Sequence, residues 1–573
     1  MIKKNVFLII AALLVFSACA KEEKPQISAD LLITNCNLAT LSDTLITGNT
    51  IAVRGDTIWK IGFIEQLIKH KSDSTIVIDA KKNFVMPGLI DSHMHLLSLG
   101  ASRVNLDLSG AKNWDEVILM VVNAAREAGI GKWVVGRGWH QDKWNPKPVD
   151  NVNGYPVHDV LSEAVPANPV ILTHASGHAA FANKKAMDLA GIDDSTANPE
   201  GGVIVRNADG KATGVFEETA EELIWKPYLD KQAKLSTKQK NDNIRRNLTL
   251  ALDELKKYGI TSIHDAGSTF EEVEIYKKEA EEGSLTTRLN IMLYETNKIL
   301  KEKIGTIKDS SYNTEFLRVR SVKKYIDGAL GSRGALLFEP YNDLPEHTGL
   351  QVTPNTELRE TAKLCLKHGF QICTHAIGTK GNSEMLDIYS SVLKKSTAPD
   401  SLRWRIEHAQ HVLPQDIKRF AKYGIIAAMQ GKHCTSDAVF VAERLGEERA
   451  RETSYAWRSM IDGGVIVCNG TDAPVESVNP FESIYSSITR KTESGFEFFP
   501  EQKMTREEAL KSYTINGAYA SFEEDIKGTL ELGKLADIII IDTDLINAPE
   551  DDIKNAKVLF TIVGGKIVYG EVE

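Results

Sequence analysis

Residues 85–95 decide the fold, and they read Val85-Met86-Pro87-Gly88-Leu89-Ile90-Asp91-Ser92-His93-Met94-His95. The apolar first part has the composition of a buried strand, and the stretch ends in two histidines, His93 and His95. Successive side chains of a strand point to opposite faces, so both imidazoles project from the same face and can bind one metal ion. Two such histidines also suit a hydrogen-bonded structural role, so this motif alone is a weak signal.

Seven further apolar segments end in polar, mostly ionisable residues, and amphipathic helical stretches separate them. With 90–95, the predicted strands end at 169–174, 260–265, 322–327, 371–375, 405–408, 425–430 and 465–472. Alternating strands and helices predict an α/β fold, either a parallel barrel or a doubly wound sheet. Eight strands with ionisable carboxyl ends favour the (β/α)8 TIM barrel, whose catalytic face lies there.

Three more candidate metal ligands end predicted strands, namely His375, His408 and Asp472. A barrel brings the carboxyl ends of its strands together on one face, so these residues are expected to join His93 and His95. Packing alone does not explain five metal-competent residues at the ends of four strands. We therefore predict a site for one or two divalent metal ions.

Lys323 lies near the end of the predicted strand that follows 260–265 in this series. An ammonium cannot ligate a cation, whereas a lysine carbamate offers two anionic oxygens that bridge two metal ions. Strand alternation places Lys323, Tyr325 and Asp327 on one face. Ile326 shares the other face with Lys324 and suits the helix-facing side, so Lys323 is expected to point inward. A buried ion pair between Lys323 and Asp327 is the alternative.

Both ends of the chain are rich in β-type sequence and predict one small β-sandwich domain. Its strands are expected at 31–34, 50–53, 535–542 and 558–563. Two separate β appendages are the alternative. The predicted domains are the composite β domain at 30–87 and 527–573, the catalytic barrel at 88–526, and an inserted subdomain or lid at about 100–168.

Residues 1–19 are predicted to be a lipoprotein signal peptide. Lys3 and Lys4 precede an apolar run that is too short to span a bilayer as a helix. The small residues before Cys19 resemble a bacterial lipobox, in which this cysteine becomes the lipidated N-terminus. Simple cleavage or a retained anchor is the alternative.

The lipid anchor predicts an exported protein that is periplasmic or held at the outer membrane. Residues 20–29 would form a solvated tether. Within it, the run Lys21-Glu22-Glu23-Lys24 also resembles the signal that sends some lipoproteins to the cell surface.

The composition excludes several classes of protein. The 573 residues are 42% hydrophobic and 25% charged, which excludes disordered, collagen-like and coiled-coil chains. The formal net charge of −10 argues against a nucleic-acid partner. Six cysteines without a Cys-x-x-Cys pair are too sparse for a disulfide scaffold.

Together these residues resemble the amidohydrolase superfamily, specifically the YtcJ-like branch of amidohydrolase family 3, over nearly the whole chain after the signal. As an ordered set, the motifs are highly specific. Besides 85–95 they are Asp327-Gly328-Ala329-Leu330-Gly331-Ser332-Arg333, His375-Ala376-Ile377-Gly378, Glu407-His408-Ala409-Gln410, Thr471-Asp472-Ala473-Pro474, Tyr513-Thr514-Ile515-Asn516 and Gly533-Lys534-Leu535-Ala536-Asp537.

The resemblance implies a metal-dependent hydrolase of amide or related carbon–nitrogen bonds, with zinc as the expected metal. Asp472 would contact a metal ion and the attacking water. The implied ligands are His93 and His95 for one ion, His375 and His408 for the other, and carboxylated Lys323 as the bridge.

His178 is a second catalytic candidate, because Ser176-Gly177-His178 stands where the branch often has Asp-Gly-His. It is expected to contact substrate or stabilise the oxyanion, and a hydrogen-bonded loop histidine is the alternative. The substrate-binding candidates are Trp139, His140, Trp144, Asp327 and His433, with Asp437 beside the last. For the aromatic residues near 140, packing of the inserted subdomain is the alternative, and for His433 and Asp437 a solvated surface position.

Two segments depart from the usual motifs of the branch. Thr379-Lys380-Gly381 stands where Asp-Arg-Ala is common, and Gln430-Gly431-Lys432-His433 where Gln-Pro-Thr-His is common. The metal-ligand candidates are unaffected. The polar network that faces the substrate differs, so the resemblance does not carry a relative's substrate to this chain.

The sequence thus predicts hydrolysis of a small molecule by metal-activated water. One alternative is the same metal site acting on an ester or lactone, or deaminating a ring. Another is a lipid-anchored solute-binding protein without catalysis. The expected partners are a small-molecule substrate and, through Cys19, a membrane.

Overall fold

The computed structural model describes residues 27–308 and 310–572. The predicted signal peptide, Cys19 and most of the tether lie outside these residues. Across the described ranges, no helix is both long enough and apolar enough to cross a membrane.

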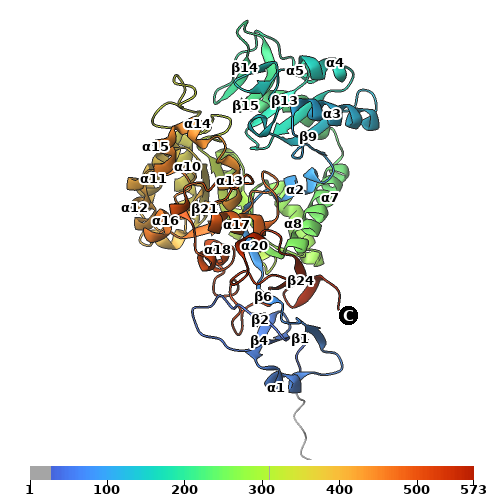
Figure 1. The fold of residues 1–573 in the computed structure, drawn as a ribbon, viewed down its shortest axis with the longest axis vertical. Helices are drawn as coiled ribbons and strands as arrows, with labels where there is room; N and C mark the ends of the chain where they lie inside the picture. The colour runs from blue at the N-terminus through green and yellow to red at the C-terminus, as the bar shows by residue number, and fades with distance from the viewer. Residues whose placement is uncertain (1–26, 309, 573) are drawn as a thin grey trace, which may run out of the picture.

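A barrel of eight parallel strands forms the centre of the molecule (Figure 1). Its strands, in hydrogen-bonded order, are β7 (Leu89–Met94), β16 (Ile260–Ser268), β17 (Arg288–Leu293), β18 (Leu317–Tyr325), β19 (Gln371–Ala376), β20 (Arg405–His408), β21 (Ile426–Met429) and β22 (Val467–Asn469). The chain after β22 closes the ring, because Asp472 N donates to His93 O at 2.7 Å and His95 N donates to Ala473 O at 2.8 Å. The predicted TIM barrel is confirmed.

One of the eight predicted barrel strands is wrong. The segment that ends at His174 forms β12 (Val170–His174), which belongs to a separate sheet, and the barrel instead contains β17. Both are short, largely buried runs that mix apolar residues with two polar ones, Thr173 and His174 in β12 and Arg288 and Asn290 in β17, so hydrophobic pattern does not distinguish them. β12 resembled a barrel strand because it ends in a histidine, whereas β17 ends in Met292 and Leu293.

Helices surround the barrel, and their ends follow ordinary capping rules. Ser236 is the N-cap of α7 and Thr269 is the N-cap of α8, each with a reciprocal capping box. Gly369 ends α10 in the left-handed conformation at φ 73°. The main barrel helices are α2 (Leu96–Ser102), α7 (Thr237–Leu255), α8 (Phe270–Glu282), α9 (Asn297–Lys303), α10 (Asn355–His368), α11 (Thr379–Leu393), α12 (Pro414–Lys422), α13 (Gly431–Asp437), α14 (Val441–Leu445), α15 (Glu447–Thr453), α16 (Trp457–Asp462), α17 (Pro480–Thr489), α18 (Arg506–Ser512) and α19 (Ile515–Ala520).

An inserted six-stranded sheet lies at one end of the barrel, at the top of Figure 1. It has its own apolar core under α3 (Trp114–Ala128), α4 (Asp159–Ala164) and α5 (Lys184–Ala190), and α6 (Glu221–Ala233) follows it. The predicted insertion at about 100–168 covers only part of it. Its strands are β14 (Gly202–Arg206), β15 (Ala212–Glu218), β13 (Ala179–Ala182), β12, β9 (Val134–Trp139) and β8 (Leu106–Asp107).

Two small sheets at the opposite end combine both ends of the chain, as the predicted β-sandwich requires (Figure 1). They share an apolar core that includes Ile33 and Ile540, so two separate appendages are excluded. β6 pairs with β23 in antiparallel register. One sheet is β4 (Thr57–Gly62), β3 (Thr50–Arg54), β1 (Leu31–Thr34) and β5 (Ile76–Asp79); the other is β2 (Asn37–Leu38), β6 (Phe84–Pro87), β23 (Ile538–Ile541), β24 (Val558–Val563) and β25 (Lys566–Tyr569).

A buried ion pair joins these sheets to the barrel. Arg288 of β17 donates from Nε and Nη2 to the two carboxylate oxygens of Asp537, at 2.8 and 2.9 Å. Asp537 closes the motif Gly533-Lys534-Leu535-Ala536-Asp537. The motif therefore has a structural reason, because its carboxylate fixes the terminal sheets to a barrel strand.

Candidate metal centre

The carboxyl end of β7 and the loop after β22 bring two histidines to one carboxylate. Asp472 Oδ1 lies 3.2 Å from His95 Nε2 and 3.5 Å from His93 Nε2. The ligand atoms of these three residues all lie within 4.8 Å of one another, which suits one metal ion. Burial, followed by the charge of Lys323, lowers the pKa of His93 to about 4, so this imidazole is neutral and free to ligate at neutral pH.

His408 and Asp472 have unusual backbone conformations, with φ 71° and 57°. Positive φ is uncommon for residues other than glycine and costs on the order of 1–3 kcal/mol, and it gathers at functional sites. The turn aims the His408 ring at the site, with its centroid 4.7 Å from that of His93 and 4.5 Å from that of His375. Gln430 Oε1 lies 2.8 Å from His408 Nδ1 and accepts a hydrogen bond from it, which leaves Nε2 available as a ligand.

Lys323 and His375 complete the group. The Lys323 side chain is fully buried, and its Nζ lies 4.6 Å from the centre of the Tyr325 ring. The Tyr325 ring is 5.1 Å from that of His375. Lys324 turns outward instead and donates to Glu295 O and to Glu357 Oε1 at 3.1 and 3.2 Å.

The alternative ion pair between Lys323 and Asp327 is not present. The Asp327 carboxylate accepts backbone N–H groups of Leu336, Ile377 and Gly378 at 2.8 to 3.0 Å. It therefore organises the loops after β18 and β19. Asp327 is also fully buried and does not line the cavities described below, but its Oδ1 lies 3.7 Å from His375 Nε2, so its role as a substrate-binding residue stays a prediction.

A second layer of charged residues supports the site from inside the barrel. Arg405 donates from Nε and Nη2 to the two oxygens of Glu407, both at 2.8 Å, and Glu407 Oε2 accepts from His93 Nδ1. Arg405 also donates to Ser92 O at 2.6 Å and to His264 Nδ1 at 2.8 Å. The hydrogen bond from His93 Nδ1 to Glu407 fixes the His93 ring so that Nε2 faces the site.

The motifs did not identify Arg405 and Glu407 as residues of the site, although Glu407 belongs to the motif Glu407-His408-Ala409-Gln410. Period-two alternation along β20 gives the signal that was available, since Arg405 and Glu407 share one face and Ile406 the other.

Four buried polar atoms of this site have no hydrogen-bond partner among the described residues. Buried polar groups are normally satisfied, so a cluster of unsatisfied ligand atoms indicates a missing partner. A divalent cation fits this donor set of imidazole nitrogens and carboxylate oxygen, and a carbamate on the lysine would add oxygens. The atoms are His93 Nε2, Lys323 Nζ, His375 Nε2 and Asp472 Oδ1.

Two adjoining cavities of about 290 and 50 Å³ open above these atoms. His178 borders both, from the turn between β12 and β13, with its ring centroid 4.9 Å from that of His375. The larger cavity is also lined by Arg137, Glu218, Tyr294 and Tyr325. The smaller is also lined by His140, Leu330, His433, Asp437 and Phe440.

His433 contacts Asp472 directly, with Nε2 3.1 Å from Oδ2. Burial lowers the pKa of His433, but hydrogen bonds to Asp472 and Glu476 outweigh it and raise the pKa to about 10. An imidazolium donates protons and does not ligate. Geometry alone groups His408, His433 and Asp472 as a second possible metal set, and this charge favours a hydrogen-bonding role for His433.

Trp139 and Trp144 do not reach these cavities, so their prediction as substrate-binding residues is wrong. Both are buried in the core of the inserted sheet, where their rings stack 5.9 Å apart, and Trp139 Nε1 donates to Leu172 O at 2.8 Å. Side chains alternate between the two faces of β9, and Trp139 lies on the face that packs into this core. His140 follows it and faces the opposite side, where it stacks on Phe440 at the smaller cavity.

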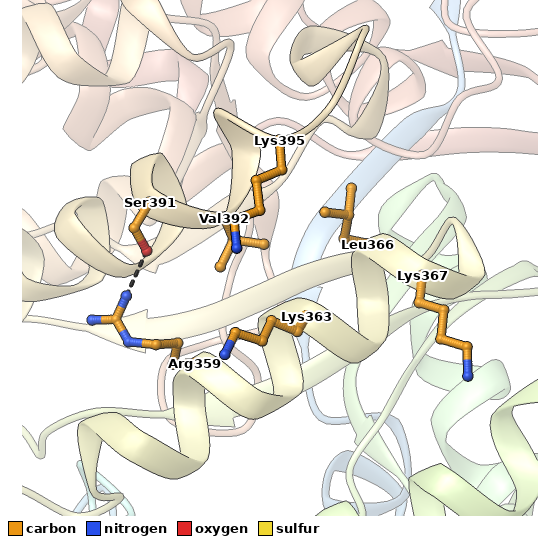
Figure 2. A pocket seen from close by; sticks show the side chains of 7 residues that line it. All are labelled: Arg359, Lys363, Leu366, Lys367, Ser391, Val392 and Lys395. Atoms are coloured by element: carbon orange, nitrogen blue, oxygen red, sulfur yellow. Dashed lines mark hydrogen bonds between the residues drawn. The ribbon is translucent and has the colours of Figure 1, made fainter.

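A separate groove of about 320 Å³ lies outside the barrel between α10 and α11 (Figure 2). Its lining includes Arg359, Lys363, Lys367 and Lys395, and Arg359 Nη1 donates to Ser391 Oγ at 2.5 Å. It contains no histidine or carboxylate, so its chemistry differs from that of the metal centre.

Histidines, a lysine and a carboxylate at the carboxyl end of a (β/α)8 barrel define a metal-dependent hydrolase. The profile of the family described as "Amidohydrolase family" matches residues 76–569, and the chain belongs to this family. It is thus an amidohydrolase, an enzyme of carbon–nitrogen bonds other than peptide bonds.

Three curated relatives align over most of their length. Protein LONG AFTER FAR-RED 3 of Arabidopsis thaliana is 34% identical and covers 95% of this chain and 92% of its own. Putative amidohydrolase YtcJ of Bacillus subtilis is 28% identical over 87% and 92%. N-substituted formamide deformylase of Arthrobacter pascens is 28% identical over 94% and 98%.

A solved structure of an uncharacterized metal-dependent hydrolase from Pyrococcus horikoshii OT3 has a similar fold. Its TM-score is 0.71 at 25% identity, and the match covers 91% of this chain and 99% of that one. These comparisons confirm the predicted family, the YtcJ-like resemblance and the fold class.

Proposed function

We propose that this amidohydrolase cleaves the amide bond of a small N-acyl compound, of which an N-substituted formamide is the simplest class. The unsatisfied atoms of His93, Lys323, His375 and Asp472 carry the proposal, because they converge below a cavity of about 290 Å³. The formamide deformylase activity in the name of a relative that aligns over 94% of this chain supports this substrate class.

The proposed metal is zinc, held by the four histidines and Asp472. His93 and His95 would hold one ion, and His375 and His408 a second. Burial lowers the pKa of Lys323 to about 8, although Glu407 and Asp472 oppose the shift, so part of this lysine is the neutral amine that carbamate formation requires. Bound ions lower the pKa of a coordinated water toward about 7 and polarise the scissile carbonyl.

Asp472 is the proposed general base. Burial raises its pKa, but the hydrogen bond from His433 and the adjacent imidazoles of His95 and His93 hold it well below its ordinary value, so it is ionised at neutral pH. The carboxylate takes a proton from water during attack and returns it to the leaving nitrogen, as one group serving as base and then acid. Burial lowers the pKa of His178, but the Glu218 carboxylate outweighs it and raises the pKa above its ordinary value. His178 faces the same cavity, and as an imidazolium it would donate a hydrogen bond from Nε2 to the developing oxyanion.

We propose export and membrane attachment through lipid-modified Cys19, at the periplasmic side or on the outer membrane, with the cell surface as a further location. The pattern of residues 1–19 and the polar tether after it support this. Cys19→Ala should move the protein from the membrane to the soluble fraction; membrane retention would contradict the anchor.

The test of the enzymatic proposal combines metal analysis with a matched substrate panel. The panel contains N-butylformamide, N-butylacetamide and 4-nitroacetanilide, with butyl acetate and γ-butyrolactone as oxygen counterparts. We expect stoichiometric zinc and amide hydrolysis. Esters and lactones cleaved without amides would favour the same site with different selectivity. A metal-free, inert protein that binds solute tightly would support the binding-protein alternative.

Two variants test the residue roles. Asp472→Asn should keep most of the metal and lose about 100-fold or more in kcat, the usual range for a lost acid–base group. Lys323→Ala should lose metal and activity and regain part of both in the presence of short carboxylic acids, which replace the carbamate. Full metal occupancy without rescue would contradict the bridging role.

A further inference from the structure

Glu218 contacts His178 through both its backbone and its side chain. It ends β15, and its backbone N donates to His178 O at 3.1 Å, while its Oε2 accepts from His178 Nδ1 at 3.0 Å. Its φ of 53° is in the left-handed region that residues other than glycine rarely adopt. The backbone is therefore held in an unfavourable conformation that turns this carboxylate toward His178.

The other carboxylate oxygen of Glu218 rests on two glycines of the barrel. An added Cβ would lie 1.7 Å from Oε1 at Gly328 and 2.2 Å from it at Gly334. Neither glycine has a left-handed φ, so space for the carboxylate, rather than backbone freedom, explains both. Gly328 N donates to Gly334 O at 3.2 Å, which closes the loop on which Glu218 is seated.

This seat is a poor structural element in energetic terms. The Glu218 side chain is only 4% exposed, and its Oε1 has no hydrogen-bond partner in the described ranges. A buried carboxylate with an unmatched oxygen costs free energy that an apolar side chain of similar size avoids. Stability of the fold therefore does not explain a carboxylate at this position. Its hydrogen bond to the His178 side chain does.

We infer that Glu218 is a positioning residue for catalysis: seated on Gly328 and Gly334, it fixes the His178 ring through Nδ1 so that Nε2 faces the substrate above His375. The inference rests on the proposed role of His178. The insertion thereby supplies the barrel with His178 and with the carboxylate that orients it. Contact with this carboxylate explains why glycine stands at 328, in the Asp327-to-Arg333 motif, and at 334, just after it.

A double-mutant cycle with N-butylformamide tests the inference. We expect Glu218→Ala to lower kcat by about 10-fold or more with KM little changed, as for coupled contacting residues. In a His178→Ala background, the same change should cost less than about 2-fold. Equal losses in both backgrounds would show that Glu218 acts independently of His178 and would overturn the inference.

Two further variants guard against a folding defect. Gly334→Ala should reproduce the Glu218→Ala loss by displacing the carboxylate, with zinc content and Tm near those of the wild type. Gly110→Ala is its control, because an added Cβ there meets no atom within 4 Å. Asp209→Asn, in the exposed turn between β14 and β15, controls for loss of a negative charge. A fully active Gly334→Ala enzyme would contradict the seat.

Imidazole nitrogen NMR separates failure of this inference from failure of the proposed function. If the wild type hydrolyses none of the panel, the proposed function fails, and the His178 ¹⁵N signals, assigned with His178→Gln, still report which ring nitrogens carry a proton. Glu218→Gln should shift the His178 Nδ1 signal from that of a fixed Nδ1–H. An unchanged signal would overturn the positioning role whatever the activity.

Discussion

The buried pair of Arg405 and Glu407 makes Glu407→Gln the most informative single substitution. The amide keeps one acceptor oxygen but loses the charge that faces Arg405 and His93. Removing one partner of a buried ion pair costs about 3–5 kcal/mol, and the retained oxygen places the expected loss near the lower limit. Because Glu407 orients His93, zinc affinity should also fall by about 10- to 100-fold.

The assay is urea unfolding of the metal-free protein together with competitive zinc titration. Glu360→Gln is the matched control, because its pair with Lys301 is about half exposed and such pairs contribute under about 1 kcal/mol. A free energy of unfolding within 1 kcal/mol of the wild type, with zinc affinity within 2-fold, would refute the reasoning.

The effect of Glu407→Gln on the free energy of unfolding should depend on pH. Burial raises the pKa of Glu407, but Arg405 and then His93 outweigh it and hold the pKa well below the ordinary 4.5. Below pH 4.5 the unfolded chain takes up a proton at this position while the folded chain does not. The free energy of unfolding therefore decreases as the pH is lowered. The difference between wild type and Glu407→Gln should be greatest above pH 5 and narrow as the pH falls below 4.5.

Three other predictions follow from described contacts. Arg288→Met leaves the buried Asp537 unpaired and should lower the free energy of unfolding by about 3–5 kcal/mol, whereas Lys238→Met, at an exposed pair, should cost under about 1 kcal/mol; equal effects in urea melts would contradict the link. Trp139→Ala should lower the free energy of unfolding by about 3–5 kcal/mol with KM unchanged, whereas an increase in KM without loss of stability would show that this residue contacts substrate. Chelation should lower Tm and abolish hydrolysis, both restored by zinc, because it leaves buried ligand atoms unsatisfied; full activity in chelator would exclude the metal centre.

The sequence correctly predicted the barrel strands that carry candidate metal ligands near their carboxyl ends, but it missed a barrel strand that carries none. β7, β19 and β20 each have a histidine among their last two residues, so their carboxyl ends were recognisable before the fold was known. β17 carries no candidate ligand, whereas β12 ends in a histidine but belongs to the insertion. The sequence pattern therefore predicted β12 as a barrel strand in place of β17. Apolar runs buried on both faces carry no information about which sheet they join.

Side-chain direction was predictable only where a strand rule applied. Alternation correctly turned Lys323 inward and Lys324 outward. It does not tell which of two cores receives Trp139, because that depends on how the insertion packs. Glu218 lies 40 residues from His178 in sequence, and their contact arises from the pairing of β13 with β15. Such a contact depends on register and on two glycines far along the chain, which local pattern does not reveal.

The pairing of β6 with β23 sets the order in which the molecule is completed during synthesis. Val85 lies opposite Ile540, so β6, near the start of the chain, can form this pairing only after β23 has left the ribosome. Until then β6 presents an unpaired edge beside the strand that carries His93 and His95, and such edges invite wrong pairings. A chain interrupted anywhere before β23 lacks three of the five strands of this sheet, so the last segment to be translated determines whether the first becomes stable.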